Sequence, residues 1–351
     1  MTDDDRDPLL RVDDLRTVFH TDSGTVRAVD GVSLDVARGE TVCLVGESGS
    51  GKTVLSESIT RLIRDPPGEI AAGTVRFDGR DLLAASEREI EAIRGGRIAH
   101  VFQNPQDALN PVYTVGWQLI EAIRLHDDAS KSEARARAID LLERVGIPDP
   151  AGRVDDYPHE FSAGMKQRVA VAMALAGEPD LLVADEPTTA LDVTIQSQVL
   201  RLLDALRAEF EMGILFVTHD LGVVAEVADR VVVLYDGVVM ERGPVSEIFA
   251  RPAHPYTREL LAAIPGREAP SRDDGDARRR RSDPVSGSAP DGGAHATGAP
   301  DGCRYRKRCP YAVDACRRGD QPPLYDVPAA SSGHSGSDGR SGDGDSDGRS
   351  G

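Results

Sequence analysis

The strongest constraint on this chain is an eight-residue stretch that fits the pattern G-x-x-x-x-G-K-[ST]. It consists of Gly46, Glu47, Ser48, Gly49, Ser50, Gly51, Lys52 and Thr53. Residues 41–45 before it form an apolar run that predicts a buried parallel strand, and residues 54–63 after it are apolar at helical spacing. Glycines let the backbone curl so that N–H groups point at a phosphate, and the following helix adds its positive end. The stretch therefore predicts a phosphate-binding loop rather than a merely flexible Gly/Ser loop.

The side chains at the end of this loop indicate its ligand. We expect Lys52 to contact the β- and γ-phosphates of a nucleotide. The Thr53 hydroxyl is expected to ligate Mg²⁺.

Two carboxylates close a second apolar run, at residues 180–186. Asp185 is expected to hold Mg²⁺, and Glu186 to polarise the attacking water. Neighbouring side chains of a strand point to opposite faces, so two carboxylates in a row indicate that the strand has ended. The alternative is a polar cap on a buried strand, and the phosphate loop upstream favours the catalytic interpretation.

Two further strand-like runs end in a polar residue, Gln103 after residues 97–102 and His219 after residues 213–218. A polar side chain that leaves a strand at the phosphate side of an α/β sheet is well placed to meet Mg²⁺ or water, which is the role expected for Gln103. His219 is a candidate donor to the γ-phosphate. Either residue alone is equally compatible with a structural role.

The remaining chain suggests two additions to this core. Residues 9–19 and 26–36 form strand-like pieces, in which Phe19 is either a core residue or an aromatic that stacks on adenine. Residues 105–178 are mostly helical by their apolar spacing. Within them, Ser162 stands before small residues at a helix start, either as an ordinary N-cap or as an anion-binding end.

Composition limits the classes of function. The 351-residue chain carries a net charge of −18, and its lysines are only Lys52, Lys131, Lys166 and Lys307. An acidic surface argues against nucleic acid as the main ligand. It indicates either a protein of a salt-loving organism or a generic acidic surface. The N-terminus is acidic and no apolar run is long enough to span a bilayer, so we expect a cytoplasmic chain that meets the membrane through a partner.

The C-terminal part changes character. Residues 266–302 are rich in Asp, Arg, Gly, Ser and Pro and predict a disordered linker, and residues 331–351 predict a disordered tail. The linker's arginine run, residues 278–281, is either a solvated charge block or a lipid or nucleic-acid contact. Between linker and tail stand three cysteines, whereas Cys43 lies in the strand before the phosphate loop and is expected to be a buried hydrophobe.

These motifs, in this order and spacing over about residues 8–265, resemble those of an ABC-type ATPase. The matching segments are the phosphate loop (Walker A), Gln103 (Q-loop), residues 161–167 (signature), Asp185-Glu186 (Walker B), residues 190–192 (D-loop) and His219 (H-loop). Several shorter stretches narrow the resemblance to ATP-binding subunits of oligopeptide/dipeptide and nickel importers. They are residues 103–105, 109–111, 161–165, 187–194 and 254–257, together with Cys303, Cys309 and Cys316.

The resemblance and the strand–helix alternation imply an α/β P-loop NTPase core with a mostly parallel sheet, a small antiparallel β layer, an inserted helical subdomain and a C-terminal extension. The expected division is a core at 8–104 and 179–243, a helical (signature) subdomain at 105–178, an extension at 244–330 and a tail at 331–351.

The resemblance also implies a reaction and partners. Two cassettes would sandwich two ATP molecules, each site being closed by Ser162 and Gly164 of the partner. ATP hydrolysis would energise peptide uptake at the cytoplasmic face of the membrane. The expected partners are a second homologous ATP-binding subunit in a heterodimer, two permease subunits and an extracellular substrate-binding protein. Import of nickel or another solute, and a non-transport ABC ATPase, are the alternatives.

Two departures from the family pattern bear on these expectations. Ala163 follows Ser162 where the signature usually has glycine, which is expected to weaken closure of the site. Relatives carry a fourth cysteine and ligate an iron–sulfur cluster, but no cysteine follows Cys316 here. Three thiolates could hold a cluster with an exchangeable fourth ligand, or zinc together with His334, or no metal.

Overall fold

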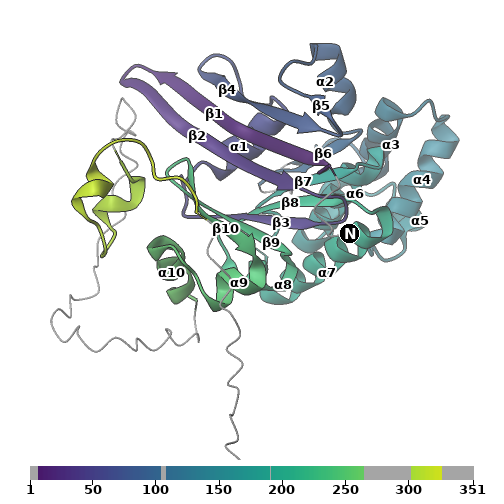
Figure 1. Cartoon of the computed structure of the whole chain (residues 1–351). Helices are drawn as coiled ribbons and strands as arrows, with labels where there is room; N and C mark the ends of the chain where they lie inside the picture. Colours follow the sequence, from purple (N-terminus) through teal and green to yellow (C-terminus); the bar gives the residue numbers. More distant parts are fainter. Residues whose placement is uncertain (1–6, 104–107, 190, 265–301, 326–351) are drawn as a thin grey trace, which may run out of the picture.

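Two β-sheets form the centre of the molecule, and helices surround one of them (Figure 1). The computed structural model describes residues 7–103, 108–189, 191–264 and 302–325. The predicted tail, His334 and nearly all of the predicted linker lie outside these ranges. Gly302 was expected to end the linker, but it is buried and packs its backbone against Cys316, so it belongs to the ordered C-terminal segment.

The larger sheet has six strands in the order β10-β9-β3-β8-β7-β6. Their bounds are β3 Thr41–Val45, β6 Ile98–Val101, β7 Leu181–Asp185, β8 Gly213–Thr218, β9 Arg230–Tyr235 and β10 Val238–Pro244. All neighbours pair in parallel except β9 and β10, which form an antiparallel hairpin. Every residue of β3, β7 and β8 is buried, as expected for strands covered on both faces. The carboxyl ends of these strands share one edge.

The smaller sheet is antiparallel, in the order β2-β1-β4-β5. Its strands are β1 Leu10–Thr21, β2 Gly24–Val36, β4 Gly68–Phe77 and β5 Arg80–Asp81. The piece predicted at residues 9–19 lies within β1, in which the chain bulges after Val12 and Asp14 takes a φ of 46°. Apolar residues of both sheets and of the helix after the phosphate loop make one core cluster.

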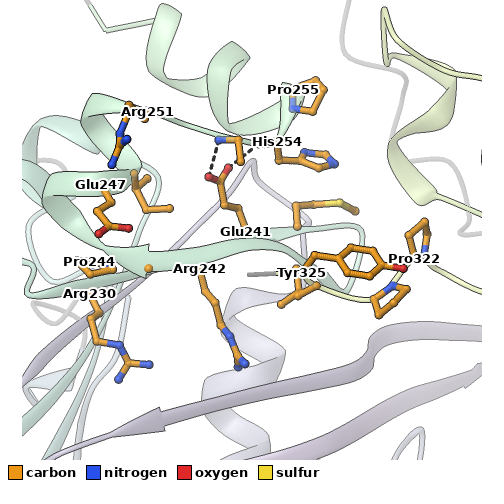
Figure 2. A pocket seen from close by; sticks show the side chains of 16 residues that line it. Arg230, Glu241, Arg242, Pro244, Glu247, Arg251, His254, Pro255, Pro322 and Tyr325 are labelled. Carbon is orange, nitrogen blue, oxygen red and sulfur yellow. Dashed lines mark hydrogen bonds between the residues drawn. The ribbon is translucent and has the colours of Figure 1, made fainter. Parts of the chain in front are cut away.

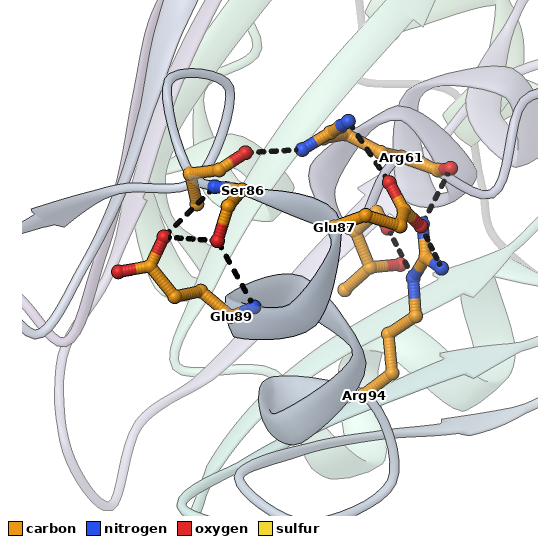
Figure 3. Close-up of polar contacts among 7 residues, drawn as sticks. Arg61, Ser86, Glu87, Glu89 and Arg94 are labelled. Atoms are coloured by element: carbon orange, nitrogen blue, oxygen red, sulfur yellow. Dashed lines mark hydrogen bonds and ion pairs between the residues drawn. The ribbon is translucent and has the colours of Figure 1, made fainter.

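The helix after the phosphate loop, α1 (Lys52–Ile59), is shorter than predicted because Arg61 adopts a left-handed φ of 56°. Figure 3 shows how its end is tied to α2 (Glu87–Ile93). Glu87 accepts from Arg61 and Arg94, both at 3.1 Å. Ser86 and Glu89 form a reciprocal capping box that begins α2.

The remaining helices form two groups (Figure 1). The predicted helical region contains α3 Val115–His126, α4 Lys131–Arg144, α5 Pro150–Arg153 and α6 Ala163–Ala174. The face of the parallel sheet away from the antiparallel sheet is covered by α7 Val193–Phe210, α8 Leu221–Val227 and α9 Val245–Ala250, with α10 Pro255–Ala262 beside them. Within the described chain, no helix combines the length and the hydrophobicity that crossing a membrane requires.

Candidate active site

The phosphate loop connects β3 to α1 and is packed tightly against its neighbours. A Cβ atom on Gly46 would lie 2.1 Å from the Leu234 carbonyl oxygen, and one on Gly51 would lie 2.2 Å from that of Ala28. No side chain fits at such distances, so these positions require glycine. Gly237, in the β9–β10 turn, donates its N–H to the Ser50 carbonyl at 2.9 Å. The loop is therefore held by contacts with β2 of the antiparallel sheet and with the β9–β10 hairpin of the parallel sheet.

Lys52 lies inside this loop with only 6% of its surface exposed. Its ammonium donates to the carbonyl oxygens of Gly46 and Glu47, both at 2.9 Å. Burial lowers the pKa of Lys52, and the nearby carboxylates of Glu186 and Asp185 partly offset this effect. A buried ammonium bonded to backbone carbonyls fits a site that receives an anion. The electrostatic effect of Glu186 on Lys52 shows that the phosphate loop and the end of β7 lie close together.

Asp185 is the last residue of β7 and is 5% exposed. Its Oδ1 has no hydrogen-bond partner among the described residues. Burial raises the pKa of Asp185, while a hydrogen bond from Thr53 lowers it. An unsatisfied buried carboxylate oxygen beside a hydroxyl fits the oxygen ligands of Mg²⁺.

Glu186 is the centre of a hydrogen-bonded group at the strand ends. Its carboxylate accepts from Gln103 Nε2 at 3.0 Å and from Thr189 Oγ1 at 3.1 Å, and it is paired with His219 Nδ1 at 2.9 Å. Burial would raise the pKa of Glu186, but the bonds to His219 and Thr189 outweigh burial and lower it. The Glu186 carboxylate is thus ionised and is held by three side chains.

Local backbone geometry explains how Asp185 and Glu186 serve one site. Glu186 has a left-handed φ of 47°, so the chain turns directly after β7 and the two carboxylates do not follow strand alternation. This turn also brings Thr189 back onto Glu186. Thr189 is not among the predicted site residues, although its place three residues after Glu186 was the available signal.

Ser162 and Gly164 are not part of this group. Ser162 is exposed and caps α6, its Oγ accepting from the Met165 N–H at 3.3 Å. Ala163 is exposed, whereas Gly164 is buried, and a Cβ on it would lie 2.8 Å from Ile195. In the described chain, no hydrogen bond joins Ser162 to the phosphate loop.

Two other predicted sites stand apart from the strand ends. Phe19 lies on β1, half-buried, opposite Val26 and Gly68. Cys303, Cys309 and Cys316 are half-buried free thiols, and the Cys303 N–H donates to the Cys316 carbonyl at 3.0 Å. Over the described ranges, no three Cys, His, Asp or Glu side chains gather as a metal site, so the arrangement of these cysteines does not support the cluster or the zinc alternative. Cys43 is fully buried, as expected.

A cavity of about 690 Å³ lies away from the phosphate loop, along β10, α9 and residues 322–325 (Figure 2). The Glu241 carboxylate accepts from the backbone N–H groups of Ala253 and His254, at 2.7 and 2.9 Å. This cavity therefore borders the ordered C-terminal segment and the start of α10.

Comparison with known families agrees with this geometry. Residues 29–189 match the family model described as ABC transporter. Residues 240–316 match the model described as oligopeptide/dipeptide transporter, C-terminal region. The chain is similar to the dimeric cassette MJ0796, solved in a post-hydrolysis state with ADP and Pi, at 28% identity and a TM-score of 0.60, covering 67% of this chain and 98% of that one.

Two curated relatives extend over nearly the whole chain. The oligopeptide transport ATP-binding protein OppD of Bacillus subtilis is 47% identical over 91% of this chain and 86% of its own length. The dipeptide transport ATP-binding protein DppD of Escherichia coli is 49% identical over 90% of this chain and 92% of its own length. The chain therefore belongs to the ABC transporter ATP-binding proteins that carry the oligopeptide/dipeptide transporter C-terminal region.

Proposed function

We propose that this protein hydrolyses ATP to energise the import of oligopeptides or dipeptides through membrane permease subunits. The observation that carries the proposal is the convergence of Lys52, Asp185 and Glu186 in a chain that also matches the peptide-transporter C-terminal region. The names of the relatives OppD and DppD support peptide as the cargo.

The residues of the site divide the work of hydrolysis. The N–H groups of residues 46–53 and the Lys52 ammonium bind the phosphates. Thr53, Asp185 and Gln103 would hold Mg²⁺, which offsets negative charge on the phosphates. Glu186 accepts the proton of the attacking water at its carboxylate, and His219 orients Glu186 and donates towards the γ-phosphate. The Phe19 ring would stack on the adenine base.

The exposure of Ser162 supports a two-chain site, because this end of α6 stands outside the group around Glu186 and is accessible to a nucleotide held by another chain. We propose a heterodimer with a homologous ATP-binding subunit, closed by ATP and released by hydrolysis. Residues 105–178 would act as the helical subdomain that moves two permease subunits, and residues 8–104 and 179–243 as the core. An extracellular binding protein would deliver the cargo, and the assembly would lie at the cytoplasmic face.

The deciding experiment reconstitutes the protein with its partner ATPase and permeases in proteoliposomes. Phosphate release should rise when the binding protein is loaded with peptide and should not rise with Ni²⁺. Stimulation by Ni²⁺ alone would assign the same role to nickel import. Absence of ATP turnover in every assembly would overturn the proposed function.

The acidic composition predicts tolerance of salt. We expect the acidic surface to suit high salt, so turnover should persist in molar KCl.

The three cysteines of the C-terminal segment are a separate feature. ATP hydrolysis as proposed needs no metal at Cys303, Cys309 and Cys316. Iron and zinc analysis of the anaerobically purified protein tests whether the full chain binds either.

A further inference from the structure

The C-terminal region reaches into the phosphate loop through Tyr256. This residue of α10 is fully buried, and its hydroxyl accepts the backbone N–H of Glu47 at 2.9 Å. Glu47 is the second residue of the loop, and its carbonyl accepts from the Lys52 ammonium at 2.9 Å. One residue of the loop thus connects the Tyr256 hydroxyl to the phosphate-binding lysine.

A second contact reaches the same residue from the cysteine-bearing segment. Arg308 donates to the Glu47 carboxylate at 2.8 Å and to the Glu259 carboxylate at 2.6 Å. These bonds, those to Glu47 first, raise the pKa of Arg308, so the guanidinium remains charged. The Arg308 side chain also lies over the rings of Tyr235 and Tyr305. Arg308 therefore neutralises the one carboxylate within the loop's sequence.

Both contacts come from well-anchored elements. Before α10, the Glu241 carboxylate accepts from the His254 backbone N–H (Figure 2). His254 caps this helix, its Nδ1 accepting from the Tyr256 N–H at 3.1 Å. Tyr256 packs against Tyr235 and Tyr305, with ring centroids 4.7 and 5.4 Å away.

The cysteine-bearing segment is fixed as well, and it is the yellow-green part of Figure 1. Arg304 is 8% exposed and donates to the Asp236 carbonyl at 2.6 Å and to the Asp30 carboxylate. Asp236 precedes Gly237, which holds the Ser50 carbonyl of the loop. We call α10 together with residues 302–325 the C-terminal brace.

We propose that Tyr256 and Arg308 of the C-terminal brace are positioning residues for the nucleotide site. Tyr256 holds the first turn of the phosphate loop in the shape that accepts phosphates, and Arg308 cancels the charge of Glu47. The inference rests on the proposed ATP binding and adds a role for the C-terminal region inside the same site.

The physical reason has two parts. A loop that is already ordered loses less conformational entropy when ATP binds, so a bond that orders Glu47 raises affinity. An unpaired carboxylate beside a triphosphate repels it, and this repulsion is strong where few waters intervene. Loss of Arg308 should therefore weaken ATP binding through charge, whereas loss of the Tyr256 hydroxyl should weaken it through order.

The test measures the dissociation constant of a fluorescent ATP analogue with Mg²⁺ by titration of the full-length protein. Arg308→Ala should weaken binding about tenfold at low salt, and adding Glu47→Gln to it should restore affinity to within about twofold of the parent protein. Arg308→Lys, which keeps the charge, should retain most of the affinity. The loss should shrink at high salt, since part-exposed charges are screened.

The second variant, Tyr256→Phe, keeps the buried ring and removes only the hydroxyl. It should weaken binding about fivefold, the ratio expected for one neutral hydrogen bond. Arg306→Ala is the matched control, because Arg306 lies two residues before Arg308 in the cysteine-bearing segment but donates to the Cys303 carbonyl. The melting temperature of each nucleotide-free variant shows whether it is folded.

The outcomes separate the two proposals. If Arg308→Ala binds ATP like the parent protein, or if Glu47→Gln does not restore a folded Arg308→Ala variant, Arg308 does not act by cancelling the charge of Glu47. If the parent protein itself binds no ATP, the proposed function fails. A folded Tyr256→Phe variant with unchanged affinity would remove Tyr256 alone from the proposal.

Discussion

The phosphate-loop side of this molecule and its signature helix, α6, differ in how many hydrogen bonds their site residues form within one chain. Around Glu186, Gln103, Thr189 and His219 already form hydrogen bonds within one chain. Ser162, by contrast, is exposed and bonds to the helix that it caps. In the proposed dimer, the phosphate-loop side of one chain and the signature helix of its partner would contact the same nucleotide, yet only the phosphate-loop side is hydrogen-bonded together within one chain.

This difference indicates where control of the reaction lies. A site that binds ATP and holds its base within one chain, but lacks the closing donors, can bind without hydrolysing efficiently. Association then becomes the step that completes the catalytic group. Substitutions around Glu186 should therefore affect turnover within one chain, whereas substitutions at Ser162 should affect association of two chains.

The largest effect is expected on the prepared side. Glu186→Gln removes the proton acceptor but preserves shape, so steady-state phosphate release should fall at least ~100-fold. ATP binding should persist, and size-exclusion chromatography with ATP should show a lasting dimer. Turnover at the parent rate would contradict the assignment of Glu186 as the base.

On the closing side, Ser162→Arg should separate binding from turnover. The side chain is exposed, so the variant should fold, and its single-chain affinity for ATP should stay within about twofold. Because a long cation replaces the donor that meets the partner's nucleotide, ATP-dependent association and turnover should fall about 30-fold. Equal losses of binding and turnover would mean that Ser162 serves the site of its own chain.

A smaller effect is expected for Thr189→Val, which removes one bond to the Glu186 carboxylate without changing volume much. The rate constant kcat should fall about tenfold, since hydrogen bonds to charged groups contribute about 1.5–3 kcal/mol. The KM for ATP should change little, because Thr189 orients Glu186 and does not bind phosphate. A change confined to KM would contradict this role.

The smallest effect is expected for Ala163→Gly, which restores the usual signature. Ala163 is exposed at the first position of α6, so its methyl group is accessible to solvent in the single chain. We expect a gain in ATP-dependent association of no more than about threefold, measured by light scattering, with unchanged single-chain affinity. A tenfold gain would show that this methyl group limits closure.

Local patterns predicted much of the architecture. The strand over residues 213–218 has the expected bounds, because a continuous apolar run closed by a polar residue leaves few alternatives. The helix expected over residues 54–63 ends early, at Ile59, because the backbone turns at Arg61 whereas the hydrophobic pattern continues. The bonding of Thr189 to Glu186 depends on a turn whose left-handed residue is a glutamate, and propensity gives no signal for that.

The amino-acid order was sufficient for the phosphate loop, the carboxylates of the strand ends and the class of fold, because these follow from short spacings and strand–helix alternation. It was not sufficient for the contacts of Tyr256 and Arg308 with Glu47. These two contacts span sequence separations of 209 and 261 positions, respectively. Such pairs depend on how α10 and the cysteine-bearing segment pack on the sheet. Packing is a property of the whole chain, and no local pattern encodes it.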